Sequence, residues 1–212
     1  MTKIRFIGDV HGKFSRYKDV IKDVPVSMQV GDMGVGFYRY DYIEDRRVMT
    51  NNPPYDAMSK GNHSFIRGNH DNPQICEKQK YWIPDGTYEN SVFCIGGASS
   101  IDKHLRTEGM DWWPDEELNY NALDSINQKY LEDKPRYMMT HECPISISNI
   151  LVDRKYGSPT DTPKVFEMMF EAHKPELWIF GHWHKSFDKT ILGTRFICLN
   201  ELEYIDLEIE DE

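Results

Sequence analysis

Short apolar runs that end at a glycine or a polar residue recur along the chain. Runs of this length, bounded by turn-forming residues, are typical of strands buried inside a protein. The predicted strands are residues 3–7, 26–30, 64–66, 92–95, 137–139, 177–180 and 204–209, together with a hairpin over residues 189–198 that turns near Gly193. The pattern therefore predicts a core rich in short strands.

Apolar residues at helical spacing separate several of these strands. The clearest case is residues 13–24, where Phe14, Tyr17 and Ile21 share one helical face and Pro25 ends the helix. Further helices are predicted at residues 42–48, at 163–173, and at 114–131, where a proline and acidic residues suit the first turn. The alternation of strands and helices predicts an α/β fold.

The length of 212 residues fits one generous domain better than two. Hydrophobic residues make up 39% of the chain and aromatic residues 13%, which is enough for a folded core. No internal repeat, linker or shift in composition divides the sequence. We therefore expect residues 1–212 to form a single domain.

The N-terminal segment turns polar too soon for a signal peptide, and no later apolar run is long enough to span a bilayer. These features predict a soluble, cytoplasmic protein. The four cysteines are scattered and form no Cys-x-x-Cys pair, which indicates neither a zinc knuckle nor a disulfide framework. We expect reduced thiols packed in the core, including Cys143.

The chain is acidic, and much of the acidity lies at its C-terminal end. Residues 201–212 contain seven acids and no base, and subtracting these from the formal net charge of −10 leaves −3 for the preceding residues. An acidic protein is a poor partner for nucleic acid or an anionic membrane. We expect the acidic tail to be a solvated, partly frayed end, and infer no protein partner from it.

Carboxylate, amide and imidazole side chains stand just beyond the ends of predicted strands. They are Asp9, His11, Asp32, Asn69, His70, His141, His182 and His184. Because the carboxyl ends of parallel strands open onto one crevice, residues far apart in sequence can meet there. Such a nitrogen and oxygen donor set favours Mn, Fe, Zn, Co or Ni over Mg or Ca. Two divalent ions could share the two oxygens of Asp32.

Five blocks carry a resemblance to a known family. They are Gly8-Asp9-Val10-His11-Gly12, Gly31-Asp32, Gly68-Asn69-His70-Asp71, His141 and Gly181-His182-Trp183-His184. In this order they resemble the calcineurin-like metallophosphoesterases, and the ordered set is highly specific. The resemblance implies an α/β fold that forms a four-layer α/β/β/α sandwich of two mixed sheets flanked by helices.

The resemblance also implies roles for these residues. Asp9, His11, Asp32 and His184 would bind one metal ion, and Asp32, Asn69, His141 and His182 would bind the other. A hydroxide between the two ions would attack phosphorus, and the catalytic residue His70 would stabilise the transition state or protonate the leaving oxygen. Manganese is the favoured metal.

The sequence departs from the family's protein phosphatases in the second block. Their extra Asp, which supports the catalytic histidine, and their phosphate-contacting Arg are replaced here by Val35 and Gly36, which argues against a Ser/Thr phosphatase. The segment 96–103, with Arg106, resembles a stretch of small bacterial and phage phosphoesterases. We hypothesise that Lys103 and Arg106 replace the missing arginine as substrate-binding residues.

Some chemically able residues have simpler interpretations. His63, His104 and His173 lie outside the blocks and are expected to be structural or surface residues. The aromatic residues Phe37, Tyr38, Tyr40, Trp112 and Trp113 could form a wall for a nucleobase, but such clusters more often close the edge of a core. We favour the core interpretation.

Together these features predict a dinuclear-metal phosphoesterase. Its substrate would be a phosphomonoester or phosphodiester, with a small molecule or nucleotide favoured because the acidic chain lacks a basic stripe for long polyanions. One alternative is a nuclease of the same fold. The other is a catalytically silent scaffold, which the presence of His70 and of every matched ligand disfavours.

Overall fold

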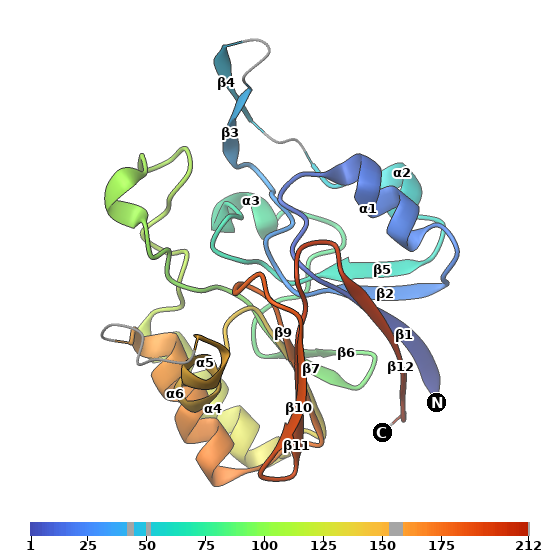
Figure 1. Cartoon of the computed structure of the whole chain (residues 1–212), viewed down its shortest axis with the longest axis vertical. Coiled ribbons are helices and arrows are strands. Elements are labelled where there is room, and N and C mark those ends of the chain that lie inside the picture. The colour runs from blue at the N-terminus through green and yellow to red at the C-terminus, as the bar shows by residue number, and fades with distance from the viewer. Residues whose placement is uncertain (42–44, 50–51, 153–158, 212) are drawn as a thin grey trace.

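The computed structural model describes residues 1–41, 45–49, 52–152 and 159–211, and its strands form two larger sheets and a small hairpin (Figure 1). The first sheet has the order β12 (Tyr204–Ile209), β1 (Thr2–Ile7), β2 (Val26–Gln29), β5 (Asn62–Phe65). The second has the order β10 (Phe187–Ile191), β11 (Thr194–Cys198), β9 (Leu177–Phe180), β8 (Tyr137–Thr140), β7 (Val92–Ile95), β6 (Thr87–Glu89).

Both sheets are mixed. Strands β1, β2 and β5 are parallel, as are β7, β8, β9 and β11, whereas β12, β10 and β6 pair antiparallel at the edges. The register places Phe6 between Met28 on β2 and Ile205 on β12. The parallel strands of each sheet therefore end at a common edge, where the loops that follow them begin.

Helices cover the outer face of each sheet (Figure 1). Helices α1 (Phe14–Ile21), α2 (Tyr55–Met58) and α3 (Pro73–Cys76) lie on the side of the first sheet. Helices α4 (Tyr120–Asp133), α5 (Ile145–Val152) and α6 (Asp161–Ala172) pack on the second. The arrangement is helix, sheet, sheet, helix, which confirms the predicted α/β sandwich.

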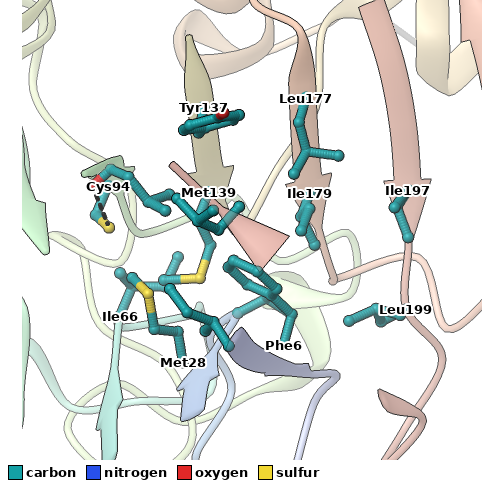
Figure 2. Packing of buried hydrophobic residues seen from close by; sticks show 14 of the residues in the cluster. Phe6, Met28, Ile66, Cys94, Tyr137, Met139, Leu177, Ile179, Ile197 and Leu199 are labelled. Atoms are coloured by element: carbon teal, nitrogen blue, oxygen red, sulfur yellow. Dashed lines mark hydrogen bonds between the residues drawn. The ribbon is translucent and has the colours of Figure 1, made fainter. Parts of the chain in front are cut away.

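The core between the two sheets explains why the strands are apolar. Phe6 and Met28 of the first sheet meet Met139 and Ile179 of the second, and all four side chains are fully buried (Figure 2). Burying such side chains contributes about 1.5–3 kcal/mol each. The outer faces of the strands pack against helices, so most strand positions are apolar without strict alternation.

A hairpin replaces the helix predicted at residues 42–48. Strands β3 (Tyr38–Asp41) and β4 (Arg46–Met49) pair antiparallel, with the backbone of residue 38 opposite residue 49. The helix prediction is therefore wrong for residues 46–48, and residues 42–44 lie outside the described part of the chain. Tertiary context outweighed local propensity here, because each strand of the hairpin supplies partners for the backbone groups of the other.

Helix α4 begins later than predicted. The structure starts it at Tyr120 instead of residue 114, because the side chain of Asn119 caps it by accepting a hydrogen bond from the Ala122 amide at 3.1 Å. Glu116, expected in the first turn, instead binds Ser100. Helix α5 was not predicted, because its apolar residues alternate with serines in a strand-like pattern.

The acidic C-terminal segment was expected to be partly frayed, but most of it is ordered in the fold. It contains β12, which pairs with β1 along six residues, and its carboxylates have partners. Asp206 accepts two hydrogen bonds from Arg5, at 2.7 and 2.9 Å, and Asp211 accepts one from the Thr2 hydroxyl at 3.1 Å. Some of the acidic side chains therefore help to hold β12 against β1.

Replacing Arg5 by methionine is expected to lower the free energy of unfolding by about 2–3 kcal/mol. The Arg5 side chain is 9% exposed and also contacts the exposed Asp23 at 2.9 Å, so its loss removes the main partner of the half-buried Asp206 carboxylate. Urea denaturation measures the change. The matched variant Arg195→Met breaks the exposed pair with Asp188 and should cost less than about 1 kcal/mol; equal losses would contradict this account.

Within the described residues, no helix combines the length and apolar character needed to cross a membrane. All four cysteines are buried and unpaired, as expected, and Cys143 is fully buried.

Candidate functional site

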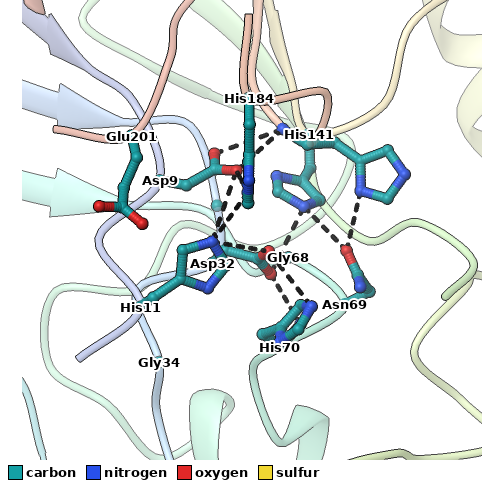
Figure 3. A network of polar contacts seen from close by, with 12 residues as sticks. Asp9, His11, Asp32, Gly34, Gly68, Asn69, His70, His141, His184 and Glu201 are labelled. Atoms are coloured by element: carbon teal, nitrogen blue, oxygen red, sulfur yellow. Dashed lines mark hydrogen bonds and ion pairs between the residues drawn. The ribbon is translucent and has the colours of Figure 1, made fainter. Parts of the chain in front are cut away.

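The predicted site residues meet where the parallel strands of both sheets end (Figure 3). Asp9 and His11 follow β1, Asp32 follows β2, and Asn69 and His70 follow β5. From the second sheet, His141 directly follows β8, and His182 and His184 follow β9. The sandwich therefore collects into one place residues that are up to 175 positions apart in sequence.

The backbone at this edge is unusual. His11, Asp32, His182 and His184 all have positive φ angles, of 49°, 55°, 64° and 48°. The left-handed region is uncommon for residues other than glycine and costs about 1–3 kcal/mol in strained cases. Backbone strain of this kind is concentrated at functional sites. The four angles therefore indicate that these loops position side chains at a cost in stability.

Glycines in the blocks permit close packing around the two carboxylates. A Cβ atom on Gly68 would overlap Oδ1 of Asp32, and a Cβ atom on Gly181 would overlap Oδ1 of Asp9. Any other residue at these positions would displace a carboxylate. This explains why a glycine directly precedes Asn69 and His182.

One group of donors consists of Asp9, His11, Asp32 and His184. Each offers one ligand atom, and these atoms all lie within 4.8 Å of one another. Nε2 of His184 is 3.0 Å from Oδ2 of Asp9 and 2.9 Å from Nε2 of His11. Oδ2 of Asp32 lies 3.8 Å from Nε2 of His11. The four side chains point at one spot, as a metal ion requires.

A second group of donors lies on the other side of Asp32. Oδ1 of Asn69 is 3.1 Å from Nε2 of His141 and 3.0 Å from Nδ1 of His182. Nε2 of His141 is 3.4 Å from Oδ1 of Asp32. Nδ1 of His141 donates to the carbonyl oxygen of Val30 at 2.8 Å, which leaves Nε2 free to bind a cation.

The residues present fit divalent metal ions. Asp9 and Asp32 are 0% and 1% exposed, and buried carboxylates need a cationic partner. Among the described residues, only histidines approach them within ion-pair distance. Imidazole nitrogen together with carboxylate and amide oxygen suits a borderline divalent transition metal.

The electrostatics of the metal-free site follow from the same contacts. Burial opposes the charged form of Asp32, but the neighbouring imidazoles of His70 and His141 hold the pKa of Asp32 well below its usual value. Burial also disfavours a charged His141, yet Asp32 outweighs it and raises the pKa of His141 to about 10. The hydrogen bond to Asp9 raises the pKa of His184. The site thus attracts positive charge.

The sequence profile of the calcineurin-like phosphoesterases matches residues 2–186. This chain belongs to that family. A comparison with curated proteins gives no match. Among solved structures, GAP50 of Plasmodium, described as the anchor in the inner membrane complex, superposes with a TM-score of 0.51 at 12% identity, covering 94% of this chain and 72% of that one.

A second similar structure is a Staphylococcus aureus protein provisionally named a 5′-nucleotidase, solved with α-ketoglutarate. Its TM-score is 0.50 at 15% identity, and the match covers 99% of this chain. This calcineurin-like phosphoesterase spans about half (51%) of that longer protein. At these identities the likeness concerns the fold, and the family membership rests on the sequence match.

The partner of His70, which the sequence could not locate, is Arg106. The guanidinium of Arg106 lies 3.1 Å from Nε2 and 3.3 Å from Nδ1 of His70, and Asp102 holds it with contacts of 2.6 and 3.0 Å. The His70 amide donates to Oδ1 of Asp32 at 2.7 Å. Burial, together with Arg106, lowers the pKa of the His70 ring to about 4.

The two basic residues predicted to hold substrate are thus separated. Arg106 joins the donor site, whereas Lys103 on the short 3-10 helix η1 (Lys103–Leu105) lines a neighbouring cavity. Arg67, beside the third block, is buried and donates to Asp85 at 3.0 Å and to the Glu116 carbonyl at 2.8 Å. Arg67 therefore joins loops and does not face the site.

Asp71, which was not among the predicted site residues, organises the loops around the site. Asp71 is fully buried and accepts hydrogen bonds from the amides of Met33, Gly34, Val35 and Gly68, at 2.6 to 3.1 Å. These bonds fix the loops that carry Asp32 and Asn69. The sequence offered one indication of this role, because Asp71 is the last residue of the block Gly68-Asn69-His70-Asp71.

A buried chain of polar contacts orients Asn69 and was also missed. The Asn69 amide donates to the Ser100 hydroxyl at 3.0 Å, and that hydroxyl donates to Glu116 at 2.6 Å. Glu116 is 2% exposed, and burial raises the pKa of its carboxyl group. The chain turns the oxygen of Asn69 toward His141 and His182. The segment 96–103 gave a hint of Ser100 but not of this contact.

Replacing Ser100 by alanine is expected to weaken Mn(II) binding by about 10- to 100-fold, because Asn69 loses the contact that orients its amide. The affinity can be measured from the electron paramagnetic resonance signal of free Mn(II). Ser59→Ala, which removes an exposed hydroxyl of the same type, serves as the control. An unchanged affinity in Ser100→Ala would contradict the orienting role.

Glu142 gives His182 a carboxylate partner. Its Oε2 lies 3.5 Å from Nε2 of His182, while Oε1 accepts hydrogen bonds from the Cys143 amide and the Trp183 indole, both at 2.7 Å. A carboxylate behind a histidine fixes the ring and directs its other nitrogen, here Nδ1, toward the site. Its position directly after His141 was the only sequence signal.

The remaining histidines have the ordinary roles that were expected. His63 contacts the Ser27 hydroxyl at 2.8 Å, His173 contacts the Pro135 carbonyl at 3.0 Å, and His104 is exposed.

The aromatic group is divided between core and site. Trp113 is 6% exposed, in keeping with a core edge, whereas the ring of Phe37 packs against His70 with 4.8 Å between centroids. The side chain of Tyr40 lies outside the described residues.

Proposed function

We propose that this chain is a dinuclear-metal phosphoesterase that hydrolyses a phosphomonoester or phosphodiester of a small molecule or nucleotide. The observation that carries the proposal is the placement of Asp32 between two groups of nitrogen and oxygen donors, within a chain of the calcineurin-like phosphoesterase family. A carboxylate with two oxygens can serve both groups at once.

In this proposal Asp9, His11, Asp32 and His184 hold one divalent ion. The second ion is held by Asp32, Asn69, His141 and His182. Bound there, the ions would supply Lewis-acid chemistry and activate water for an in-line displacement at phosphorus. The donor types suit Mn(II), with Fe, Zn, Co or Ni as alternatives.

The chain's own groups would act on the substrate beside these donors. Arg106, held by Asp102, presents a fixed positive charge that can bind a phosphoryl oxygen in place of the arginine absent at Gly36. His70 lies between Arg106 and Asp32, where its ring can stabilise the transition state or pass a proton to the leaving oxygen.

The rival interpretations have less support. A nuclease would need a basic surface for a long polyanion, and the chain carries a formal net charge of −10. A silent scaffold would not need His70, Arg106 and both donor groups to be gathered at one place. The likeness to GAP50 concerns the fold and does not bring that protein's anchoring role to this chain.

The test is hydrolysis of para-nitrophenyl phosphate and bis-para-nitrophenyl phosphate by the Mn(II)-loaded protein. We expect turnover of at least one ester, and the ratio of the two rates then indicates a monoesterase or a diesterase. Absence of turnover with Mn(II), Fe(II), Zn(II), Co(II) and Ni(II) alike would contradict the proposed function.

A further inference from the structure

A cavity of about 330 Å³ opens beside the second group of donors. Its walls come from the segment after β7, from the start of α5 and from the start of α6. The described residues that line it include Ser99, Lys103, Ile145, Thr160, His182 and Trp183. The cavity lies on the side of the second sheet, and none of its lining residues comes from α1, α2 or the β3–β4 hairpin.

The cavity shares residues with the proposed catalytic site. His182, whose Nδ1 is 3.0 Å from the oxygen of Asn69, forms part of its wall. Ser100, which binds the amide nitrogen of Asn69 at 3.0 Å, also lines it, as does Glu142 behind the His182 ring. A group bound in the cavity would therefore be a direct neighbour of a phosphorus atom placed at the donors.

The lining suits an uncharged, ring-bearing group. Ile145 and Trp183 supply apolar surface, and Ser99 and Thr160 supply hydroxyl groups. Among the described lining residues, Lys103 brings the only permanent positive charge. The single carboxylate among them already receives hydrogen bonds from a backbone amide and an indole. Apolar walls with a few polar groups are typical of sites that bind small organic molecules.

The size of the cavity restricts the ligand further. Pockets for small molecules span about 300–1,000 Å³, and this one is at the lower end of that range. It can enclose a single ring or a nucleoside-sized group, while a simple alkyl alcohol would leave most of it unfilled. Unfilled apolar walls give up the contacts that provide affinity.

We propose that this cavity binds the ring-bearing organic group of the substrate, which is an aryl or nucleoside ester of phosphate. The inference rests on the proposed phosphoesterase function and adds the substrate class. In the reaction, water forms the new bond to phosphorus, the bond from phosphorus to the ester oxygen breaks, and that oxygen leaves with a proton. The cavity selects which ester is brought to the donors.

The test compares matched esters that differ in one group. Thymidine 5′-monophosphate is paired with 2-hydroxyethyl phosphate, and the methyl ester of thymidine 5′-monophosphate with methyl 2-hydroxyethyl phosphate, so that only one member of each pair carries a ring. In the Mn(II)-loaded protein we expect kcat/KM for the thymidine member of the hydrolysed pair to be higher by about tenfold or more, mainly through a lower KM.

Two variants fill the cavity from different walls. Thr160→Trp acts from the start of α6, where the side chain makes no capping hydrogen bond, and Ser99→Trp acts from the loop after β7. Each should reduce the ratio of the two kcat/KM values about tenfold. Lys164→Trp, one turn further along α6 on an exposed position outside the lining, should leave the ratio at its wild-type value.

The outcomes separate the two proposals. Hydrolysis with equal kcat/KM for both members of a pair, or a ratio unchanged in both filling variants, would overturn the cavity assignment while leaving the phosphoesterase function intact. If no ester is hydrolysed, the function fails, and ligand-observed NMR with thymidine then tests the cavity alone. Binding lost in Thr160→Trp but kept in Lys164→Trp supports it, and absence of binding overturns it.

Discussion

Replacing Asp32 by alanine is expected to lower kcat/KM for para-nitrophenyl ester hydrolysis by about 1,000-fold or more. In the proposed dinuclear site Asp32 would serve both metal ions, so its loss should remove several kcal/mol of transition-state stabilisation, and about 1.4 kcal/mol corresponds to a factor of ten. Asp32 is the residue through which the two donor groups meet, since its Oδ1 faces His141 and its Oδ2 faces His11.

The comparison with His11→Ala makes this prediction specific. His11 approaches only the first donor group, so its loss should cost about ten times less activity than the loss of Asp32. Asp188→Ala removes a carboxylate from an exposed surface pair and provides the control for general effects of charge. Equal losses in Asp32→Ala and His11→Ala would count against Asp32 as the shared ligand.

Replacing Arg106 by alanine is expected to lower kcat about 100-fold, the usual cost of removing one charged or hydrogen-bonding group that stabilises a transition state. The guanidinium of Arg106 lies 3.1 Å from the His70 ring, and Asp102 holds it in place. Steady-state kinetics with the better of the two para-nitrophenyl esters gives the change in kcat and in KM.

A conservative variant distinguishes geometry from charge at this position. Lysine keeps the charge but lacks the planar fork that contacts Asp102 through two nitrogens, so Arg106→Lys should recover less than about a tenth of the lost activity. Full recovery in Arg106→Lys would show that charge alone suffices. A wild-type kcat in Arg106→Ala would remove Arg106 from the proposed mechanism.

Most strands of the two larger sheets, and the meeting of the candidate site residues at one edge, could be predicted because the strand ends carry local signals. A short apolar run, then a glycine, then Asp, Asn or His recurs at Asp9, Asp32, Asn69 and His182. The glycine is required by close neighbours, which are a carboxylate at Gly68 and Gly181, the His141 ring at Gly31 and a backbone carbonyl at Gly8. The parallel strands bring these positions to one edge. A local pattern was therefore enough to predict a gathering of distant residues.

Contacts made by long loops could not be predicted in this way. Arg106 reaches His70 across 36 positions and Glu116 reaches Ser100 across 16, and no periodicity in the sequence records either contact. The start of α4 was misplaced for a related reason, because Glu116 serves a buried hydrogen-bond chain instead of a first helical turn. Tertiary contacts overrode local preference at these positions.

The contacts of the acidic C-terminal segment could not be predicted from the sequence either. Its composition resembles that of a solvated end, but pairing of β12 with β1 and the two hydrogen bonds from Arg5 to Asp206 turn it into an edge strand. The alternating pattern of residues 204–209 predicted the strand correctly. The partners of its charges became visible only with the fold.

The central claim is that hydrolysis depends on two metal ions held by donors that share Asp32. The most direct measurement titrates metal-stripped protein with Mn(II) and follows bound metal per chain and bis-para-nitrophenyl phosphate hydrolysis in the same samples. We predict that two ions bind per chain and that hydrolysis rises with the second. Hydrolysis that survives complete removal of metal, or that reaches its maximum with one bound ion, would contradict the account.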